Sequence, residues 1–141
     1  MKWLFIYAHM DDETILSYGL MRRLIDEGHD VNLLTFCGKS RKDDPNWKKQ
    51  KRIDSFKRNM NFLKNIALLN FNDLTLTDNI LEKHMSSFIF QLQPDVIVTH
   101  SSFDNHFEHR IVSQQTLLAS RIKNNFKCIK KLMFSSSPTY S

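Results

Sequence analysis

The sequence has few glycines, and their placement excludes the common phosphate-binding motifs. Only three of the 141 residues are glycine, at positions 19, 28 and 38. No two of them have the spacing of the glycine-rich dinucleotide fingerprint or of a P-loop, which need glycine where the backbone approaches a phosphate. A nucleotide-binding α/β protein is therefore not expected.

The sequence also lacks the features of membrane and secreted proteins. No apolar run approaches the roughly 20 residues of a membrane span. The apolar stretch near the N-terminus breaks at His9, too soon for the core of a signal peptide. The two cysteines, Cys37 and Cys128, lie far apart with no CxxC spacing. We therefore expect a cytoplasmic protein with reduced thiols, without a membrane span.

What the sequence does have is a regular alternation of apolar runs and amphipathic stretches. At 141 residues, with 41% hydrophobic and 25% charged residues, it is long enough for one globular domain. The apolar runs predict strands at residues 3–6, 31–37, 66–71, 96–99 and 128–134. The stretches between them predict helices at about 12–27, 49–64, 78–93 and 108–123, the third capped by Asp78 or Asn79. This order predicts an α/β fold: a Rossmann-like, doubly wound, mostly parallel sheet of about five strands with helices on both faces.

The first strand ends in the sequence Tyr-Ala-His-Met-Asp-Asp-Glu at residues 7–13. A strand followed by an acid-capped helix would explain one or two of the carboxylates, with Asp11 or Asp12 as the N-cap. It does not explain His9. A histidine and three carboxylates in one turn are unfavourable unless a cation or a helix N-terminus balances them. This stretch is therefore a candidate metal site.

The fourth predicted strand ends in similar chemistry. Residues 100–109, His-Ser-Ser-Phe-Asp-Asn-His-Phe-Glu-His, contain three of the six histidines of the chain. The carboxyl ends of parallel strands lie at one edge of the sheet, where ligands bind. Imidazole and carboxylate groups from two separate loops are the ligand set of a catalytic zinc site with a position left for water. We therefore expect the two motifs to meet.

Together, the His-x-Asp-Asp-Glu motif and the later His-x-x-x-Asp-x-His-x-x-His motif resemble those of the PIG-L/LmbE family of zinc-dependent N-acetylglucosamine deacetylases. The resemblance extends from residue 3 to about residue 123 and implies a single deacetylase domain over residues 1–141 that uses Zn²⁺, with Fe²⁺ as the alternative ion. The family usually has proline where this chain has Met10. Since this position supplies no metal ligand, the departure concerns the rigidity of the loop more than the chemistry.

The resemblance also implies a role for five residues of the two motifs. His9, Asp12 and His109 match the positions that bind the metal in the family. Asp11 matches the general base that accepts a proton from the attacking water. His106 matches the residue that stabilises the tetrahedral oxyanion or protonates the leaving amine.

Four further residues are secondary candidates. Asp104 and Glu108 are expected to orient the metal-binding histidines, although Asp104 also fits a simple turn residue. Arg52 falls where the family often has an arginine on the second helix, and Asp73 resembles an aspartate that follows the third strand. Both are weaker candidates for substrate contacts. For Arg52 the reason is that the glutamate often found three residues after that arginine is Ser55 here.

Positive charge is concentrated in one part of the sequence. Ten of the twenty Lys and Arg residues lie between positions 39 and 64, and the formal net charge is +5. A solvated surface explains this concentration, and an electropositive rim that attracts an anionic substrate is the functional alternative. Nucleic acid is not an expected partner, because the segment has few aromatic residues and no known reader motif.

The sequence thus predicts a metal-dependent hydrolase that removes the N-acetyl group from an N-acetylglucosamine-containing conjugate, a small molecule that could be anionic, and releases acetate and a free amine. Two alternatives remain: another metal-dependent hydrolase, for instance a phosphoesterase, and a non-catalytic binding or accessory module on the same scaffold. The last predicted strand is followed only by a polar tail. We therefore expect a domain curtailed at its C-terminus, with either self-association into a homo-oligomer or an unusually open site.

Overall fold

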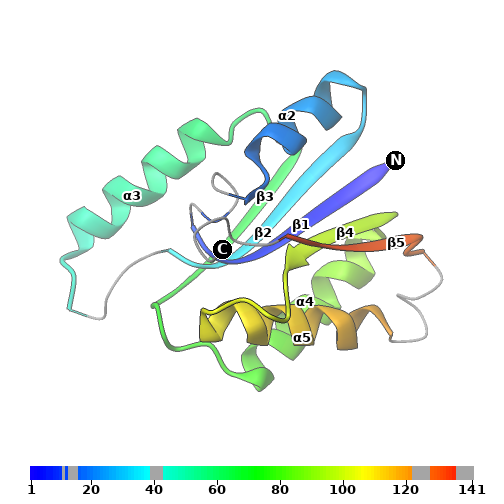
Figure 1. The fold of residues 1–141 in the computed structure, drawn as a ribbon. Helices are drawn as coiled ribbons and strands as arrows, with labels where there is room; N and C mark the ends of the chain where they lie inside the picture. The colour runs from blue at the N-terminus through cyan, green and yellow to red at the C-terminus, as the bar shows by residue number, and fades with distance from the viewer. Residues whose placement is uncertain (11, 13–15, 39–42, 122–127, 136–141) are drawn as a thin grey trace.

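A central sheet of five parallel strands organises the molecule (Figure 1). The computed structural model describes residues 1–10, 12, 16–38, 43–121 and 128–135. Within them the strand order is β3-β2-β1-β4-β5. The strands are β1 (Lys2–His9), β2 (Asp30–Cys37), β3 (Asn65–Phe71), β4 (Val96–His100) and β5 (Lys131–Ser135). The Rossmann-like parallel sheet predicted from the sequence is confirmed.

Helices cover both faces of this sheet, as predicted (Figure 1). Helices α2 (Tyr18–Asp26) and α3 (Asn46–Asn59) lie on one face, and α4 (Asp78–Leu92) and α5 (Phe107–Ser120) on the other. Successive side chains of a strand point to opposite faces, so β1 is buried on both sides. Its residues Trp3, Phe5 and Tyr7 belong to the core under α2 and α3. Leu4, Ile6 and Ala8 belong to the core under α4 and α5.

Several element boundaries differ from the predicted ones. Of the helix predicted over residues 12–27, the described residues Asp12 and Leu16 are helical, a turn at Ser17 interrupts it, and α2 continues over Tyr18–Asp26. Helix α3 spans Asn46–Asn59 rather than about 49–64, because Pro45 starts it early and the chain turns at Met60. Strand β5 begins at Lys131 rather than 128. There it comes into register with Val96, the first residue of β4.

The helix caps also correct one prediction. The N-cap of α4 is Thr77, whose hydroxyl accepts a hydrogen bond from the backbone N–H of Ile80, and not Asp78 or Asn79. A threonine hydroxyl at this position satisfies one of the free N–H groups of the first turn. At its other end α4 stops at Leu92, because Gln93 adopts a left-handed conformation and Pro94 follows.

The sheet order determines where a site can form. The strand order reverses between β1 and β4, and in open parallel sheets ligands bind outside the carboxyl ends of the strands at such a reversal. Ile6 pairs with Thr99 in the ladder of these two strands. The next residues along, from Tyr7 to His9 on β1 and His100 on β4, therefore lie side by side at this edge, as the two motifs predicted.

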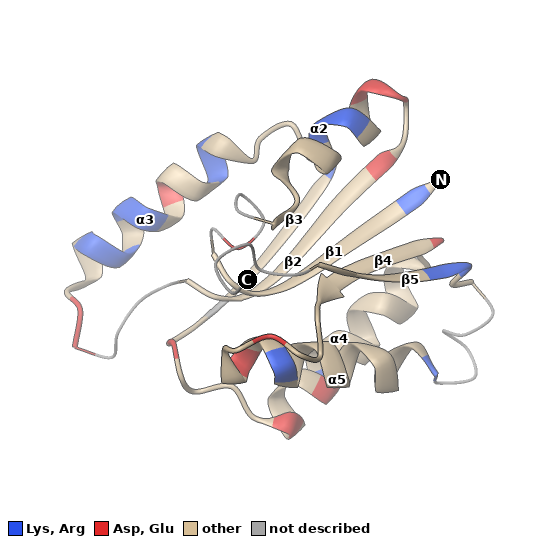
Figure 2. Cartoon of the chain, viewed as in Figure 1, with Lys and Arg blue, Asp and Glu red and all other residues tan. Residues whose placement is uncertain are grey.

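Lysine and arginine recur along α3 (Figure 2). The exposed basic residues of this helix are Lys48, Lys51, Lys57 and Arg58. The preceding basic residues, Lys39, Arg41 and Lys42, lie outside the described residues. In the part of the chain that the structure describes, no helix combines the length and the apolar character that a bilayer span requires.

Candidate metal centre

Three side-chain atoms converge at the carboxyl end of β1. Nδ1 of His9 lies 3.3 Å from Nε2 of His109 and 3.4 Å from Oδ2 of Asp12. Nε2 of His109 lies 3.1 Å from the same carboxylate oxygen. Zinc bonds of about 2.0–2.1 Å in a tetrahedral site separate neighbouring ligand atoms by about 3.3–3.4 Å. The three atoms therefore fit three corners of a tetrahedral metal site.

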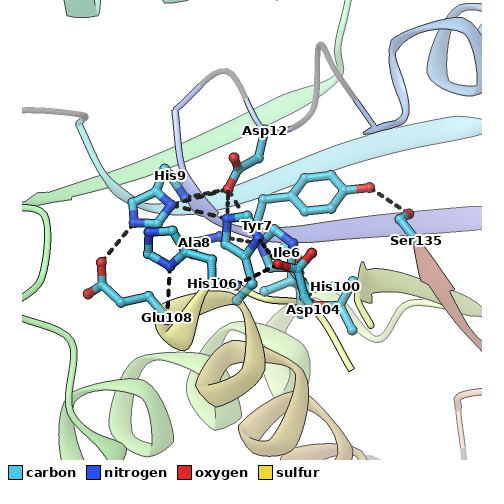
Figure 3. Close-up of polar contacts among 12 residues, drawn as sticks. Ile6, Tyr7, Ala8, His9, Asp12, His100, Asp104, His106, Glu108 and Ser135 are labelled. Carbon is cyan, nitrogen blue, oxygen red and sulfur yellow. Dashed lines mark hydrogen bonds and ion pairs between the residues drawn. The ribbon is translucent and has the colours of Figure 1, made fainter. Parts of the chain in front are cut away.

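Each of the two histidines turns its other ring nitrogen toward a carboxylate. Nε2 of His9 lies 2.7 Å from Oε1 of Glu108 (Figure 3). Nδ1 of His109 lies 3.1 Å from Oδ1 of Asp104, at ion-pair distance. The same oxygen of Asp104 accepts a hydrogen bond from the backbone N–H of His106. A carboxylate on the outer nitrogen fixes the tautomer and the orientation of a metal-binding histidine, which is the position expected for Asp104 and Glu108.

Glu108 also ties a distant loop to the site. Its side chain is fully buried, and its two oxygens accept hydrogen bonds from the backbone N–H groups of Leu74 (2.8 Å) and Leu76 (3.0 Å). Burial opposes the charged form, but the bonds to His9 and to the two N–H groups hold the pKa of Glu108 below its usual range. The loop between β3 and α4 is thus anchored to a hydrogen-bond partner of His9, which is a predicted metal ligand. No local sequence pattern signals this contact.

The charges of the site favour a cation. Burial alone would lower the pKa of His9, but the carboxylates of Asp12 and Glu108 outweigh it and raise this pKa to about 9. Burial likewise opposes ionisation of Asp12, yet the surrounding imidazoles of His100, His109 and His9 hold its pKa well below its usual range. Positive charge between these side chains is therefore stabilised. A divalent ion would supply it, and the residues present fit such an ion.

His106 lies beside the histidines of the three converging atoms. It is the N-cap of α5, and its Nδ1 accepts a hydrogen bond from the backbone N–H of Glu108 (3.1 Å). Its ring centroid lies 4.7 Å from those of both His9 and His109. Burial and the two neighbouring histidines lower the pKa of His106. Because Nδ1 accepts, the neutral ring carries its proton on Nε2.

The remaining sequence candidates are placed less tightly. A carboxylate oxygen of Asp73, a nitrogen of His9 and the sulfur of Cys37 lie within 4.8 Å of one another, so Asp73 is next to the site on its β3 side. Arg52 lies on α3, where its Nη1 is 2.9 Å from Oδ2 of Asp44. To contact a substrate Arg52 would have to share or release this partner. Asp11 falls outside the described residues.

From the sequence, His100 is expected only to form a hydrogen bond at the end of its strand. The structure places it directly behind the site, where its Nε2 accepts a hydrogen bond from the N–H of Ala8. His100 is fully buried at the end of β4, and its ring is parallel to that of His109, with centroids 3.8 Å apart and an interplanar angle of 6°. Burial lowers the pKa of His100 to about 4, so the ring is neutral. Its place at the start of the second motif was the only available signal, and this does not distinguish a ligand from a support.

The sequence matches one family model and short stretches of curated relatives. The model described as "PIG-L: GlcNAc-PI de-N-acetylase" matches residues 4–120. A 1D-myo-inositol 2-acetamido-2-deoxy-alpha-D-glucopyranoside deacetylase from Segniliparus rotundus is 66% identical over 32 residues, which are 23% of this chain and 10% of the relative. The aligned stretch is thus far shorter than that relative.

Solved structures share the fold at low sequence identity. The N,N'-diacetylchitobiose deacetylase from Pyrococcus horikoshii superposes with a TM-score of 0.75 and 19% identity, over 90% of this chain and 53% of that one. The 4-carboxy-2-hydroxymuconate hydratase GalB from Pseudomonas putida superposes with a TM-score of 0.71 and 16% identity, over 84% of this chain and 55% of that one. The matched part of this chain thus spans about half the length of either protein.

Proposed function

The chain belongs to the PIG-L family, and from this premise we propose that it is a metal-dependent N-deacetylase that acts on an N-acetylglucosamine-containing conjugate and releases acetate and a free amine. One observation carries the proposal: two imidazole nitrogens and one carboxylate oxygen lie 3.1–3.4 Å from one another, with the Nε2–H donor of His106 beside them. Both the Segniliparus and the Pyrococcus proteins are named as deacetylases of N-acetylated amino sugars.

In this proposal His9, Asp12 and His109 hold the ion through Nδ1, Oδ2 and Nε2. Zinc suits two imidazoles and one carboxylate, and ferrous iron is the alternative for the same donor set. When bound, the ion supplies a Lewis acid for the amide carbonyl and lowers the pKa of a water molecule to about 7. Asp104 and Glu108 keep the two imidazoles in the tautomers that present these nitrogens.

In this proposal, side chains of the protein accept and donate the protons of the reaction. Asp11 accepts a proton from the attacking water as the water oxygen bonds to the acetyl carbon. His106 donates a hydrogen bond from Nε2 to the oxygen that becomes negative, and the Glu108 N–H on its Nδ1 keeps it in the required tautomer. The carbon–nitrogen bond then breaks as the amine takes up the proton that Asp11 removed from the water. The products are acetate and the amino sugar.

The substrate is expected to be a small amino-sugar conjugate. Asp73, next to His9, would accept hydrogen bonds from sugar hydroxyls, and the basic residues of α3 and of the preceding loop would attract an anionic group on the conjugate. Arg52 is the weaker contact, because it already pairs with Asp44. We also propose a cytoplasmic location, because the sequence has only two cysteines, far apart and without CxxC spacing.

Acetate release from a panel of substrates tests the proposal. The panel contains N-acetylglucosamine, N-acetylglucosaminyl-inositol, N,N'-diacetylchitobiose and phosphate esters, each with the Zn²⁺- or Fe²⁺-loaded chain. Metal-dependent release of acetate from an amino sugar is expected, and His106→Ala should abolish it, whereas His84→Ala on the outer helix α4 should not. Turnover of phosphate esters alone would favour the other hydrolase. Absence of any turnover in a metal-loaded protein would favour a binding module.

A further inference from the structure

His100 contacts one histidine of the metal centre, His109, directly and is linked to the other, His9, through the backbone, yet it is not one of the proposed ligands. It has no exposed surface, and its ring stacks face to face on the ring of His109, with centroids 3.8 Å apart. The ring of Tyr7 meets it edge-on at 4.9 Å. His100 therefore has little freedom to move, and it restricts the orientation of the His109 ring.

The second contact reaches the other histidine through the backbone. Nε2 of His100 accepts a hydrogen bond from the N–H of Ala8 at 2.9 Å (Figure 3). Ala8 immediately precedes His9 at the carboxyl end of β1. One imidazole thus fixes the peptide unit between Tyr7 and Ala8, just before His9, by a hydrogen bond and the ring of His109 by stacking.

Packing alone does not explain a histidine at this position. Since Nε2 accepts, the proton of the neutral ring is on Nδ1. Among the described residues Nδ1 of His100 has no hydrogen-bond partner, and its burial is complete. A buried N–H without a partner is unfavourable. Phenylalanine or leucine would fill the space without this penalty but would offer no acceptor to Ala8.

We propose that His100 is a positioning residue that holds His9 and His109 in the mutual geometry required to bind the metal ion. The inference rests on the proposed function only in taking these two histidines as metal ligands. His100 acts through two contacts. Its acceptor nitrogen fixes the backbone position at the end of β1, and its ring face fixes the orientation of the His109 ring in the first turn of α5. A site without these supports would keep the same ligands but hold them less firmly.

Two variants of the full chain separate the two supports. His100→Phe keeps an aromatic face but removes the acceptor, and His100→Gln keeps an acceptor but removes the ring. Zn²⁺ affinity is measured by competition with a chelating dye, and the visible absorption of the Co²⁺-loaded protein reports the ligand geometry. Loss of a residue that supports metal ligands typically lowers metal affinity about 10–100-fold. We expect a loss in this range for both variants, with altered Co²⁺ bands.

Thr99→Val is the matched control. Thr99 is the neighbour of His100 on β4, is equally buried, and also joins β4 to β1, through a 2.8 Å hydrogen bond from its Oγ1 to the carbonyl of Ile6. This variant should lower the melting temperature but leave Zn²⁺ affinity and the Co²⁺ spectrum unchanged.

The proposal is overturned if the His100 variants bind Zn²⁺ as tightly as Thr99→Val with the same Co²⁺ spectrum. It is also overturned if neither variant gives a cooperative unfolding transition, because His100 would then be needed for folding itself. Acetate release is not part of this test. A chain that binds Zn²⁺ but releases no acetate would contradict the proposed function and leave the role of His100 standing.

Discussion

Oε1 of Glu108 lies 2.7 Å from Nε2 of His9, although 99 positions separate the two residues in the chain. The same carboxylate receives the backbone N–H groups of Leu74 and Leu76. Three segments, the end of β1, the loop after β3 and the first turn of α5, therefore meet at one buried charge. The integrity of the metal centre is expected to depend on this residue as much as on the ligands.

Removal of the ligand histidines should remove the ion. The double variant His9→Ala/His109→Ala deletes two of the three converging atoms. Metal analysis of the purified variant by mass spectrometry should detect no stoichiometric zinc or iron, whereas His84→Ala should retain it. Full metal content in the double variant would show that the ion is held elsewhere.

Asp11→Asn should abolish the reaction without loss of metal. The substitution keeps the size of the side chain but removes the proton acceptor, and general-base catalysis typically contributes about 10²–10⁴-fold to the rate. The rate of acetate release and the metal content are measured on the same sample. Asp26→Asn, at an exposed position of α2, is the control. A near-normal rate in Asp11→Asn would assign the base to another residue.

Glu108→Gln should weaken both the fold and the site. The glutamine amide has one oxygen and one NH₂ group, so it can accept a hydrogen bond from only one of the two backbone N–H groups of Leu74 and Leu76. The other N–H would face the NH₂ group, and the expected loss is about 1–3 kcal/mol of stability. Urea denaturation measures the free energy of unfolding, and dye competition measures Zn²⁺ affinity. The exposed Glu82→Gln on α4 should change neither. If Glu108→Gln matches that control, the carboxylate does not support His9.

Asp95 should make stability depend on pH in the acidic range. The hydrogen bond from the backbone N–H of Lys2, aided by Lys130, lowers the pKa of Asp95 below its ordinary value of 3.8. A depressed carboxyl pKa stabilises the fold above the unfolded-state value, and this contribution is lost as the pH falls through the folded-state pKa. Asp95→Asn should therefore melt below the native protein at pH 7.

The difference in melting temperature between the native protein and Asp95→Asn should shrink when the pH falls below 3.8. Circular dichroism melts between pH 7 and pH 3 measure it. Asp26→Asn serves as the comparison, because its exposed carboxylate makes no such contact in the described residues. A difference in melting temperature that stays constant from pH 7 to pH 3 would assign the effect of Asp95 to hydrogen-bond geometry instead of charge.

Local sequence patterns determined the order of elements and the location of the site. Apolar runs specify buried parallel strands whatever their neighbours are, so all five strands could be predicted from the sequence. Boundaries were less well predicted: Thr77, not Asp78, caps α4, and β5 begins where its ladder with β4 begins. Caps and strand ends depend on which backbone groups remain unpaired, and the composition of a segment does not specify this.

Only the tertiary structure decided which side chains of the site touch. The sequence placed His9 and His109 in two motifs, but the reversal of strand order between β1 and β4 brought them to 3.3 Å. It likewise buried His100 against His109 and turned Glu108 toward His9. These contacts join residues 9 to 100 positions apart, and their geometry follows from the packing of α5 on the sheet. Local periodicity carries no information about that packing.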